Sequence, residues 1–226
     1  MRPVSRPGAR TQLLIAGERL IAESGPDVSL RDVAVAAGQR NNSAVHYHFG
    51  SRDGLIEAII GHRQAPLEQA RLALLAEYES VGKPDDTIAA LVAILVEPLF
   101  EAPYADGSRH YARFLERVRN HPVMAELALT ADQWPATRIL TTRMLRALDY
   151  LPEAVRRQRL AAMASVMFAL LADHERLLDE HRDTATLSEA EARENIISMV
   201  VGLLTAPMVS RAAAHGASTS DGRGRQ

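Results

Sequence analysis

Apolar residues recur at helical spacing along almost the whole chain, and no run of alternating β-branched residues interrupts them. Alanine, leucine, arginine and glutamate dominate these segments, and all four favour helices. Glycine and proline fall between the segments, where they end helices. The pattern predicts an all-α protein of about nine helices, with a kink or break at Pro66. The expected helices cover residues 8–24, 30–37, 42–48, 52–80, 85–101, 107–119, 122–147, 152–181 and 188–212.

The composition narrows the class of protein. A chain of 226 residues with 47% hydrophobic and 24% charged residues is typical of a globular protein with one large or two small domains. Because cysteine is absent, disulfides, thiolate nucleophiles and cysteine-based metal sites are excluded. No signal-peptide pattern and no apolar stretch of membrane-spanning length is present. We therefore expect a cytoplasmic protein without a membrane partner.

Sequence motifs for catalysis are also missing. The chain contains no phosphate-binding glycine loop, no GxSxG and no HExxH. His46 and His48 lie on different faces of an expected helix, and His174 and His181 are two turns apart, so neither pair favours metal binding. We expect no catalytic residues, no metal and no cofactor, and we do not expect an enzyme.

The formal charge of −2 hides an asymmetry along the chain. Residues 1–52 hold seven arginines and four acidic residues, which gives +3, and the other 19 basic and 24 acidic residues give −5. Because residues 1–52 are basic while the rest of the chain is acidic, the charge distribution indicates an anionic partner for residues 1–52.

The basic part contains a candidate helix-turn-helix. Ser29, three residues before Asp32, favours a helix start, and Gly38 favours a left-handed helix end. The next expected helix carries many hydrogen-bonding side chains and few apolar ones, which is hard to explain as core. Arginine and asparagine pair with base edges, and serine, tyrosine and histidine suit phosphates. The predicted DNA-binding residues are Ser29, Arg31, Arg40, Asn41, Asn42, Ser43, His46, Tyr47, His48 and Arg52.

The stretch from Arg10 to Leu55 resembles the DNA-binding domain of the TetR family of bacterial transcriptional regulators. The resemblance rests on LIAESG (20–25), SLRDVAVAAG (29–38) and AVHYHFGSRDGL (44–55), the last being similar to the family signature LYYHFxSKxxL. It implies that Tyr47 and Arg52 lie near phosphates and that Phe49 plugs the core. His46 and Val45 depart from the signature, and the segment from Gly38 to Phe49 is one residue longer than the commonest spacing. Which of residues 40–43 face base edges therefore stays open.

The resemblance also implies a helical C-terminal domain that dimerises and binds a small molecule. Two long apolar helix faces would form a four-helix dimer interface, with an intramolecular core as the alternative. The predicted interface residues are Leu170, His174, Leu177, Ile197, Val200 and Leu204. The scarce aromatic residues and two methionines suggest a pocket, with plain core packing as the alternative. The predicted ligand-binding residues are Phe100, Tyr104, Tyr111, Phe114, Trp134, Met163, Met167 and Phe168.

These observations predict a ligand-responsive transcriptional regulator. We expect a flexible arm (1–9), a helix-turn-helix domain (10–51), a ligand-binding and dimerisation domain (52–212) and a disordered tail (213–226). As a homodimer it would repress from a pseudo-palindromic double-stranded operator, and an unidentified small-molecule effector would release it. The alternative is a helical small-molecule-binding or protein-interaction module that does not bind DNA.

Overall fold

The computed structural model describes residues 8–41, 43–80, 87–101, 109–129, 133–180 and 187–208, and within them every regular element is a helix. Asn42, Tyr104 and the expected tail lie outside the described residues. The ten helices are α1 (Ala9–Ser24), α2 (Leu30–Ala36), α3 (Ala44–Phe49), α4 (Arg52–Ser80), α5 (Ile88–Phe100), α6 (Tyr111–Val118), α7 (Pro122–Leu129), α8 (Pro135–Ala147), α9 (Glu153–Glu180) and α10 (Glu189–Thr205).

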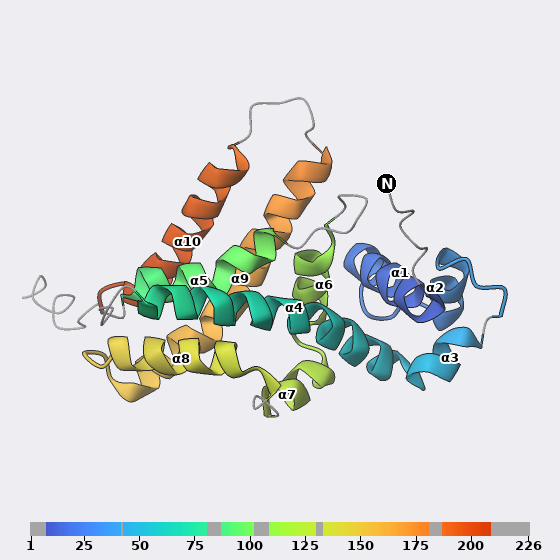
Figure 1. The fold of residues 1–226 in the computed structure, drawn as a ribbon, viewed down its shortest axis with the longest axis horizontal. Coiled ribbons are helices and arrows are strands. Elements are labelled where there is room, and N and C mark those ends of the chain that lie inside the picture. Colours follow the sequence, from blue (N-terminus) through green and yellow to red (C-terminus); the bar gives the residue numbers. More distant parts are fainter. Residues whose placement is uncertain are drawn as a thin grey trace, which may run out of the picture.

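The helices form two parts joined by α4 (Figure 1). The first part, here called the head, consists of α1 to α3 and the first turns of α4. The second part, the body, contains the rest of α4 together with α5 to α10. Within the body, α5 packs on α4, α8 and α10, while α9 packs on α6, α8 and α10. Because α4 begins beside α3 and ends among the body helices, a single rigid element connects the two parts.

Two apolar clusters form the core. The body cluster gathers buried residues of α5, α8, α9 and α10 with Leu75 of α4. The head cluster contains the buried faces of α1, α2 and α4, but it also includes Tyr111, Phe114, Leu115 and Val118 of α6. Helix α6 therefore completes the core of the head, although it is far from the head in sequence.

The structure corrects three of the expected helices. The one predicted over 188–212 ends at Thr205, since Ala206 has φ −46° and ψ 136°. The segment predicted as one helix over 122–147 is two, α7 and α8, since Pro135 starts α8 and lacks the N–H that a continuing helix requires. Trp134 before it has φ −118° and ψ 68°, outside the helical region, as expected for a residue preceding proline. The helix predicted over 42–48 begins only at Ala44.

Helix α4 contains a proline, Pro66, within its length. Helix α4 runs without interruption from Arg52 to Ser80 with Pro66 inside it, so the expected break is absent. Proline removes one backbone N–H donor, and the remaining hydrogen bonds and the packing of α4 against α1, α5 and α8 hold the helix together.

Candidate functional site

The second helix of the head is capped at both ends by residues that the sequence indicated. The Ser29 hydroxyl oxygen accepts hydrogen bonds from the backbone N–H groups of Arg31 (3.2 Å) and Asp32 (3.4 Å). At the other end Gly38 has φ +68°, and the N–H groups of Gly38 and Gln39 donate to the carbonyls of Val35 and Ala34. This is a Schellman motif. The predicted left-handed cap is confirmed, and it fixes the turn that leads to α3.

The entry into α3 is shaped by two of the predicted DNA-binding residues. Asn41 Oδ1 accepts a hydrogen bond from the backbone N–H of Ser43 at 2.9 Å, and Ser43 is the residue directly before the helix. Arg40 is exposed in the same turn. These side chains therefore lie at the N-terminal end of α3 rather than along it, because the helix starts two residues later than predicted.

Helix α3 presents a polar surface and is anchored by few apolar contacts. Val45 is fully buried and Phe49 is half-buried against the head cluster, with the Arg10 guanidinium 5.3 Å from the centre of the Phe49 ring. His46 is exposed, and Tyr47 is 85% exposed. An aromatic side chain this exposed contributes almost nothing to the core, so its position favours contact with a partner.

The turn from α3 into α4 has little steric freedom. Gly50 has φ +73°, and Ser51 Oγ accepts a hydrogen bond from the Gly54 N–H at 3.0 Å. A Cβ on Gly54 would lie 2.1 Å from the Phe49 carbonyl oxygen, so only glycine fits there. Arg52 Nη1 lies 3.5 Å from Asp27 Oδ1, in a pair that is exposed to solvent.

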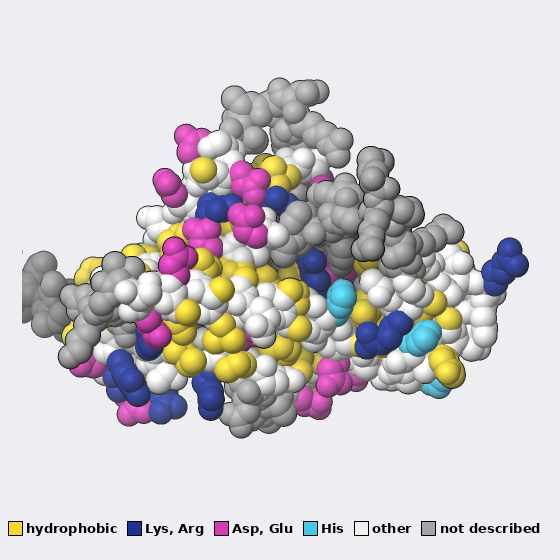
Figure 2. Space-filling view, in the orientation of Figure 1, with side chains coloured by type: hydrophobic (Ala, Val, Ile, Leu, Met, Phe, Trp, Pro, Cys, Tyr) yellow, Lys and Arg dark blue, Asp and Glu magenta, His cyan; other side chains and the backbone are white. Residues whose placement is uncertain are grey.

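Charge is distributed unevenly over the surface. In Figure 2 the visible arginine and histidine side chains on the right lie over the head, while most of the acidic ones lie over α5 and α10. Arginines also lie over the body in this view, among the acidic side chains. The head carries arginine and histidine with few acidic side chains, which suits a polyanion there.

The body contains a cavity of about 450 Å³ between α4, α5, α8 and α9. Three of the predicted ligand-binding residues, Met163, Met167 and Phe168, line it. The other lining residues were not identified from the sequence. They are Gln64, Arg71, Leu95, Leu99, Thr137, Thr141, Leu145, Arg157, Leu160, Ala161 and Ala164. The size and the mostly apolar wall with a few polar groups are typical of small-molecule sites.

A buried ion pair stands at the wall of this cavity. Arg71 and Glu68, both on α4, are 3% and 4% exposed, with 3.2 Å between Arg71 Nη1 and Glu68 Oε1. Burial lowers the pKa of Arg71, while the nearby Glu68 carboxylate opposes that shift. Arg71 lies one helical turn from both Leu67 and Leu75 on the buried face of α4, so its helical spacing could have marked it as an interior residue.

Among the described residues, the other predicted ligand-binding aromatics do not line this cavity. Tyr111 and Phe114 are buried in the head cluster, and Phe100 packs on His174 with 5.4 Å between ring centres. Trp134 lines a separate hollow beside the head, with Arg10 and His62. The alternative given for the aromatics, plain core packing, therefore describes Tyr111, Phe114 and Phe100.

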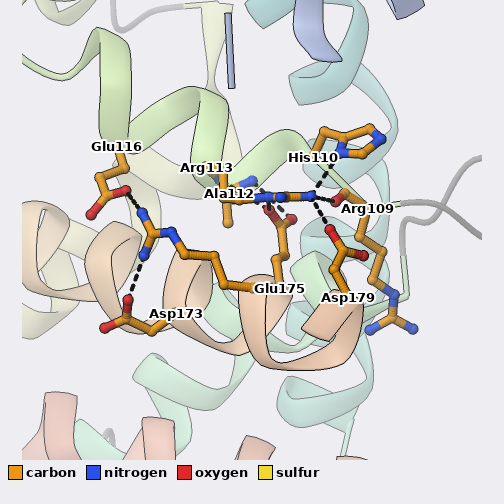
Figure 3. A network of polar contacts seen from close by, with 9 residues as sticks. Arg109, His110, Ala112, Arg113, Glu116, Asp173, Glu175 and Asp179 are labelled. Carbon is orange, nitrogen blue, oxygen red and sulfur yellow. Dashed lines mark hydrogen bonds and ion pairs between the residues drawn. The ribbon is translucent and has the colours of Figure 1, made fainter. Parts of the chain in front are cut away.

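A polar network holds α6 against α9 (Figure 3). The two oxygens of Glu175 accept hydrogen bonds from the backbone N–H groups of Ala112 and Arg113, each at 3.0 Å, at the start of α6. Burial raises the pKa of Glu175, against the effect of these donors. Arg113 also donates to Asp179 at 2.6 Å. Because α6 completes the core of the head, this network connects α9 of the body to the head.

The predicted dimer residues divide into two groups. Val200 and Leu204 of α10 are fully buried in the body cluster of the single protomer, so they belong to the intramolecular core that the sequence left as the alternative. Leu170, His174 and Ile197 are partly buried, and Leu177 is 46% exposed. Two further apolar side chains of these helices, Leu178 of α9 and Met199 of α10, are each 40% exposed.

The described part of the chain contains neither a cluster for a metal ion nor a helix that could span a membrane. There, no three histidine, aspartate or glutamate side chains are grouped so that they could hold a metal ion. None of the described helices combines the length and apolarity needed to cross a membrane.

Both the N-terminal and the C-terminal part of the chain match models of known protein families. Residues 13–59 match the model of the tetR family of bacterial regulatory proteins, and residues 93–216 match that of the tetracyclin repressor-like C-terminal domain. Among solved structures, a protein described as a TetR-family transcriptional regulator from Rhodococcus sp. is 20% identical with a TM-score of 0.44, over 87% of this chain and 98% of that one. The multidrug binding protein EbrR, solved with imidazole, is 20% identical with a TM-score of 0.32, over 92% and 99%. No curated protein matches.

Proposed function

The chain belongs to the TetR family of bacterial regulatory proteins, and from this we propose that it represses transcription as an operator-bound homodimer that a small molecule in the body cavity releases. It is a DNA-binding transcriptional regulator. The proposal adds the sign of regulation, the dimer, the residues that contact DNA and the place where the effector binds.

The observation that carries the proposal is the continuity of α4. Its first turn closes on the α3 turn through Ser51 and Gly54, and its middle supplies Gln64 and Arg71 to the cavity wall. The 19 residue steps from Arg52 to Arg71 span about 29 Å at 1.5 Å per residue. A molecule that pushes the middle of α4 must therefore tilt the element on which α3 is mounted, and so change the spacing of the two heads in a dimer. Such coupling is typically about 1–3 kcal/mol.

For the DNA contact, we propose that residues at the start of α3 read bases and that flanking residues bind phosphates. Arg40, Asn41 and Ser43 lie before the N-terminus of α3, the end that recognition helices commonly direct at base edges. Asn42, which is outside the described residues, is included because it stands between them in the sequence. Ser29, Arg31, Tyr47 and Arg52 suit the phosphate contacts, with His46 and His48 beside them.

For the dimer, we propose the face that α9 and α10 leave exposed. These two helices pack on each other, and each exposes large apolar side chains, Leu177 and Leu178 on α9 and Met199 on α10. Exposed apolar side chains on paired helices favour the addition of the same pair from a second copy.

A DNA-binding assay with a matched control tests the proposal. Labelled DNA from upstream of the protein's own gene is titrated with the parent, with Arg40→Ala and with Arg146→Ala, which removes an exposed arginine of α8 in the body. We expect Arg40→Ala to lose about 1–3 kcal/mol of binding to the specific site and Arg146→Ala to bind like the parent. Equal affinities for all three proteins would contradict the placement of the base contacts.

The effector part of the proposal needs a second experiment. Ala164→Phe places a ring in the cavity while leaving the head unchanged. Native mass spectrometry of the two purified proteins should show a retained small molecule on the parent and none on the variant, with unaltered DNA binding in its absence. Retention by both proteins would contradict the cavity as the effector site.

A further inference from the structure

The charged side chains that line the body cavity are both arginines. They are Arg71 and Arg157, and no aspartate or glutamate is among the lining residues within the described chain. The Arg157 side chain is 72% exposed and forms an ion pair with Glu153, so solvent screens its charge. Arg71 is 3% exposed. The charge that a bound molecule would meet inside the cavity therefore comes from Arg71.

Glu68 balances this charge only in part. Its carboxylate lies at the N-terminus of α8, where it accepts hydrogen bonds from the N–H groups of Ala136 (2.8 Å) and Thr137 (3.3 Å) and from the Thr137 hydroxyl (2.5 Å). A helix N-terminus carries partial positive charge and stabilises a carboxylate. Glu68 is thus satisfied chiefly by α8, and it contacts Arg71 through a single guanidinium nitrogen.

The second terminal nitrogen of Arg71 is left for another acceptor. Arg71 Nε donates to the Leu95 carbonyl at 3.1 Å, and Nη1 contacts Gln64, Glu68 and Thr137 at 3.1–3.2 Å. Arg71 Nη2 makes no hydrogen bond to any residue that the structure describes. Because Arg71 lines the cavity, an acceptor bound there can take a hydrogen bond from this nitrogen. A guanidinium nitrogen of this kind suits a carboxylate oxygen.

The rest of the wall is apolar and adaptable. Much of it is formed by Leu95, Leu99, Leu145, Leu160 and Phe168. Met163 and Met167 add flexible side chains that accommodate ligands of different shapes. A ligand with a long apolar part gains free energy when that part is buried in such a cavity, and its single charged end can lie at Arg71.

We propose that the effector is an amphipathic organic acid, whose carboxylate accepts hydrogen bonds from Arg71 and whose apolar part packs on Met163 and Met167. The inference rests on the proposed function, because it takes the body cavity as the effector site. It adds the chemical class of the molecule that the cavity selects.

Three probes of equal chain length test the charge preference. Decanoate, decanamide and decylamine are titrated into the parent protein by calorimetry near neutral pH. We expect decanoate to bind at least about tenfold more tightly than decanamide. We expect no binding of decylamine in the cavity, so any heat that it gives should be the same with Ala164→Phe as with the parent. If decanamide or decylamine binds in the cavity as tightly as decanoate, or if none of the three binds, the inference is overturned.

Two arginine variants locate the interaction. Arg71→Lys keeps a positive charge but loses the planar fork, so decanoate affinity should fall about tenfold. Arg146→Gln, which removes an exposed arginine of α8 outside the cavity lining, should bind decanoate like the parent. The reverse ranking of the two variants would overturn the inference. The three-probe comparison on the parent decides the matter alone if Arg71→Lys does not fold.

The DNA assay separates this inference from the proposed function. If decanamide or decylamine releases DNA from the parent but not from Ala164→Phe, and decanoate does not release it, the cavity remains the effector site and the acid preference is overturned. If the parent binds no DNA, the proposed function fails, while the calorimetric ranking of the probes still supports or overturns the acid preference.

Discussion

Substituting alanine for Gly54 tests the packing of α3 against α4. The added Cβ would lie 2.1 Å from the Phe49 carbonyl oxygen, and contacts of a Cβ below 3.0 Å essentially do not occur. The atoms must separate by 0.9 Å, which is the difference between those two distances. Because the clashing atom belongs to the backbone, no side-chain rotation relieves the contact, and α3 must move.

The size of the effect follows from two opposing contributions. Alanine is favoured over glycine in a helix by about 1 kcal/mol. Overpacking of this kind costs about 1–3 kcal/mol, and a backbone contact belongs at the upper end of that range. We therefore expect Gly54→Ala to lower the free energy of unfolding by about 2 kcal/mol. DNA affinity should fall as well, since α3 is displaced.

Gly61→Ala is the matched control on the same helix. Nothing lies within 4 Å of a Cβ at Gly61, so this variant should gain up to about 1 kcal/mol from helix propensity. Urea unfolding followed by circular dichroism measures both variants, and DNA titration measures the displacement of α3. If Gly54→Ala is as stable as Gly61→Ala and binds DNA equally well, the argument from the close approach is refuted.

Three further changes probe the phosphates, the dimer and the pH dependence. Arg52→Ala should weaken binding to all DNA sequences and reduce the slope of log affinity against log salt by about one; an unchanged slope would remove Arg52 from the phosphate contacts. Leu177→Arg should yield monomers by light scattering while Tyr150→Arg, exposed beyond the end of α8, stays dimeric; dimers of both would exclude the α9–α10 face. Burial, aided by Arg109, lowers the pKa of His174 in the folded protein from its usual 6.5. As the pH falls below 6.5, this histidine is protonated in the unfolded chain before it is protonated in the folded protein, so the free energy of unfolding decreases. His174→Leu should reduce the drop in the urea midpoint between about pH 7.5 and 5.5, and an unchanged drop would assign the loss to other groups.

The head could be predicted in detail because its signals are local. The Ser29 cap and the left-handed Gly38 each depend on residues within one turn of the chain, so the pattern around them specifies their conformation. The start of α3 was misplaced because Asn41 bonds the backbone of Ser43 and thereby keeps those residues outside the helix. A side chain that competes with the helix in this way is not visible in apolar spacing.

The cavity could be predicted only in part because it depends on contacts between distant segments. Met163 and Met167 were identified from their helix, but Arg71 meets Thr137 across 66 residues and only the fold brings them together. The aromatic residues are a poor guide to the cavity for the same reason. Tyr111 and Phe114 serve the core of the head, which nothing in the local sequence of α6 reveals.

The shared core has a consequence for exchanging parts between regulators. A fragment ending near residue 60 would keep α1 to α3 but lose the α6 face on which Leu13, Leu14 and Leu55 close their cluster. A unit that folds alone needs its own complete hydrophobic core. A hybrid that takes its DNA specificity from this protein would therefore have to transplant α6 with the first sixty residues. The host's own helix would then have to supply a carboxylate in place of Glu175 of α9 for the backbone N–H groups of Ala112 and Arg113.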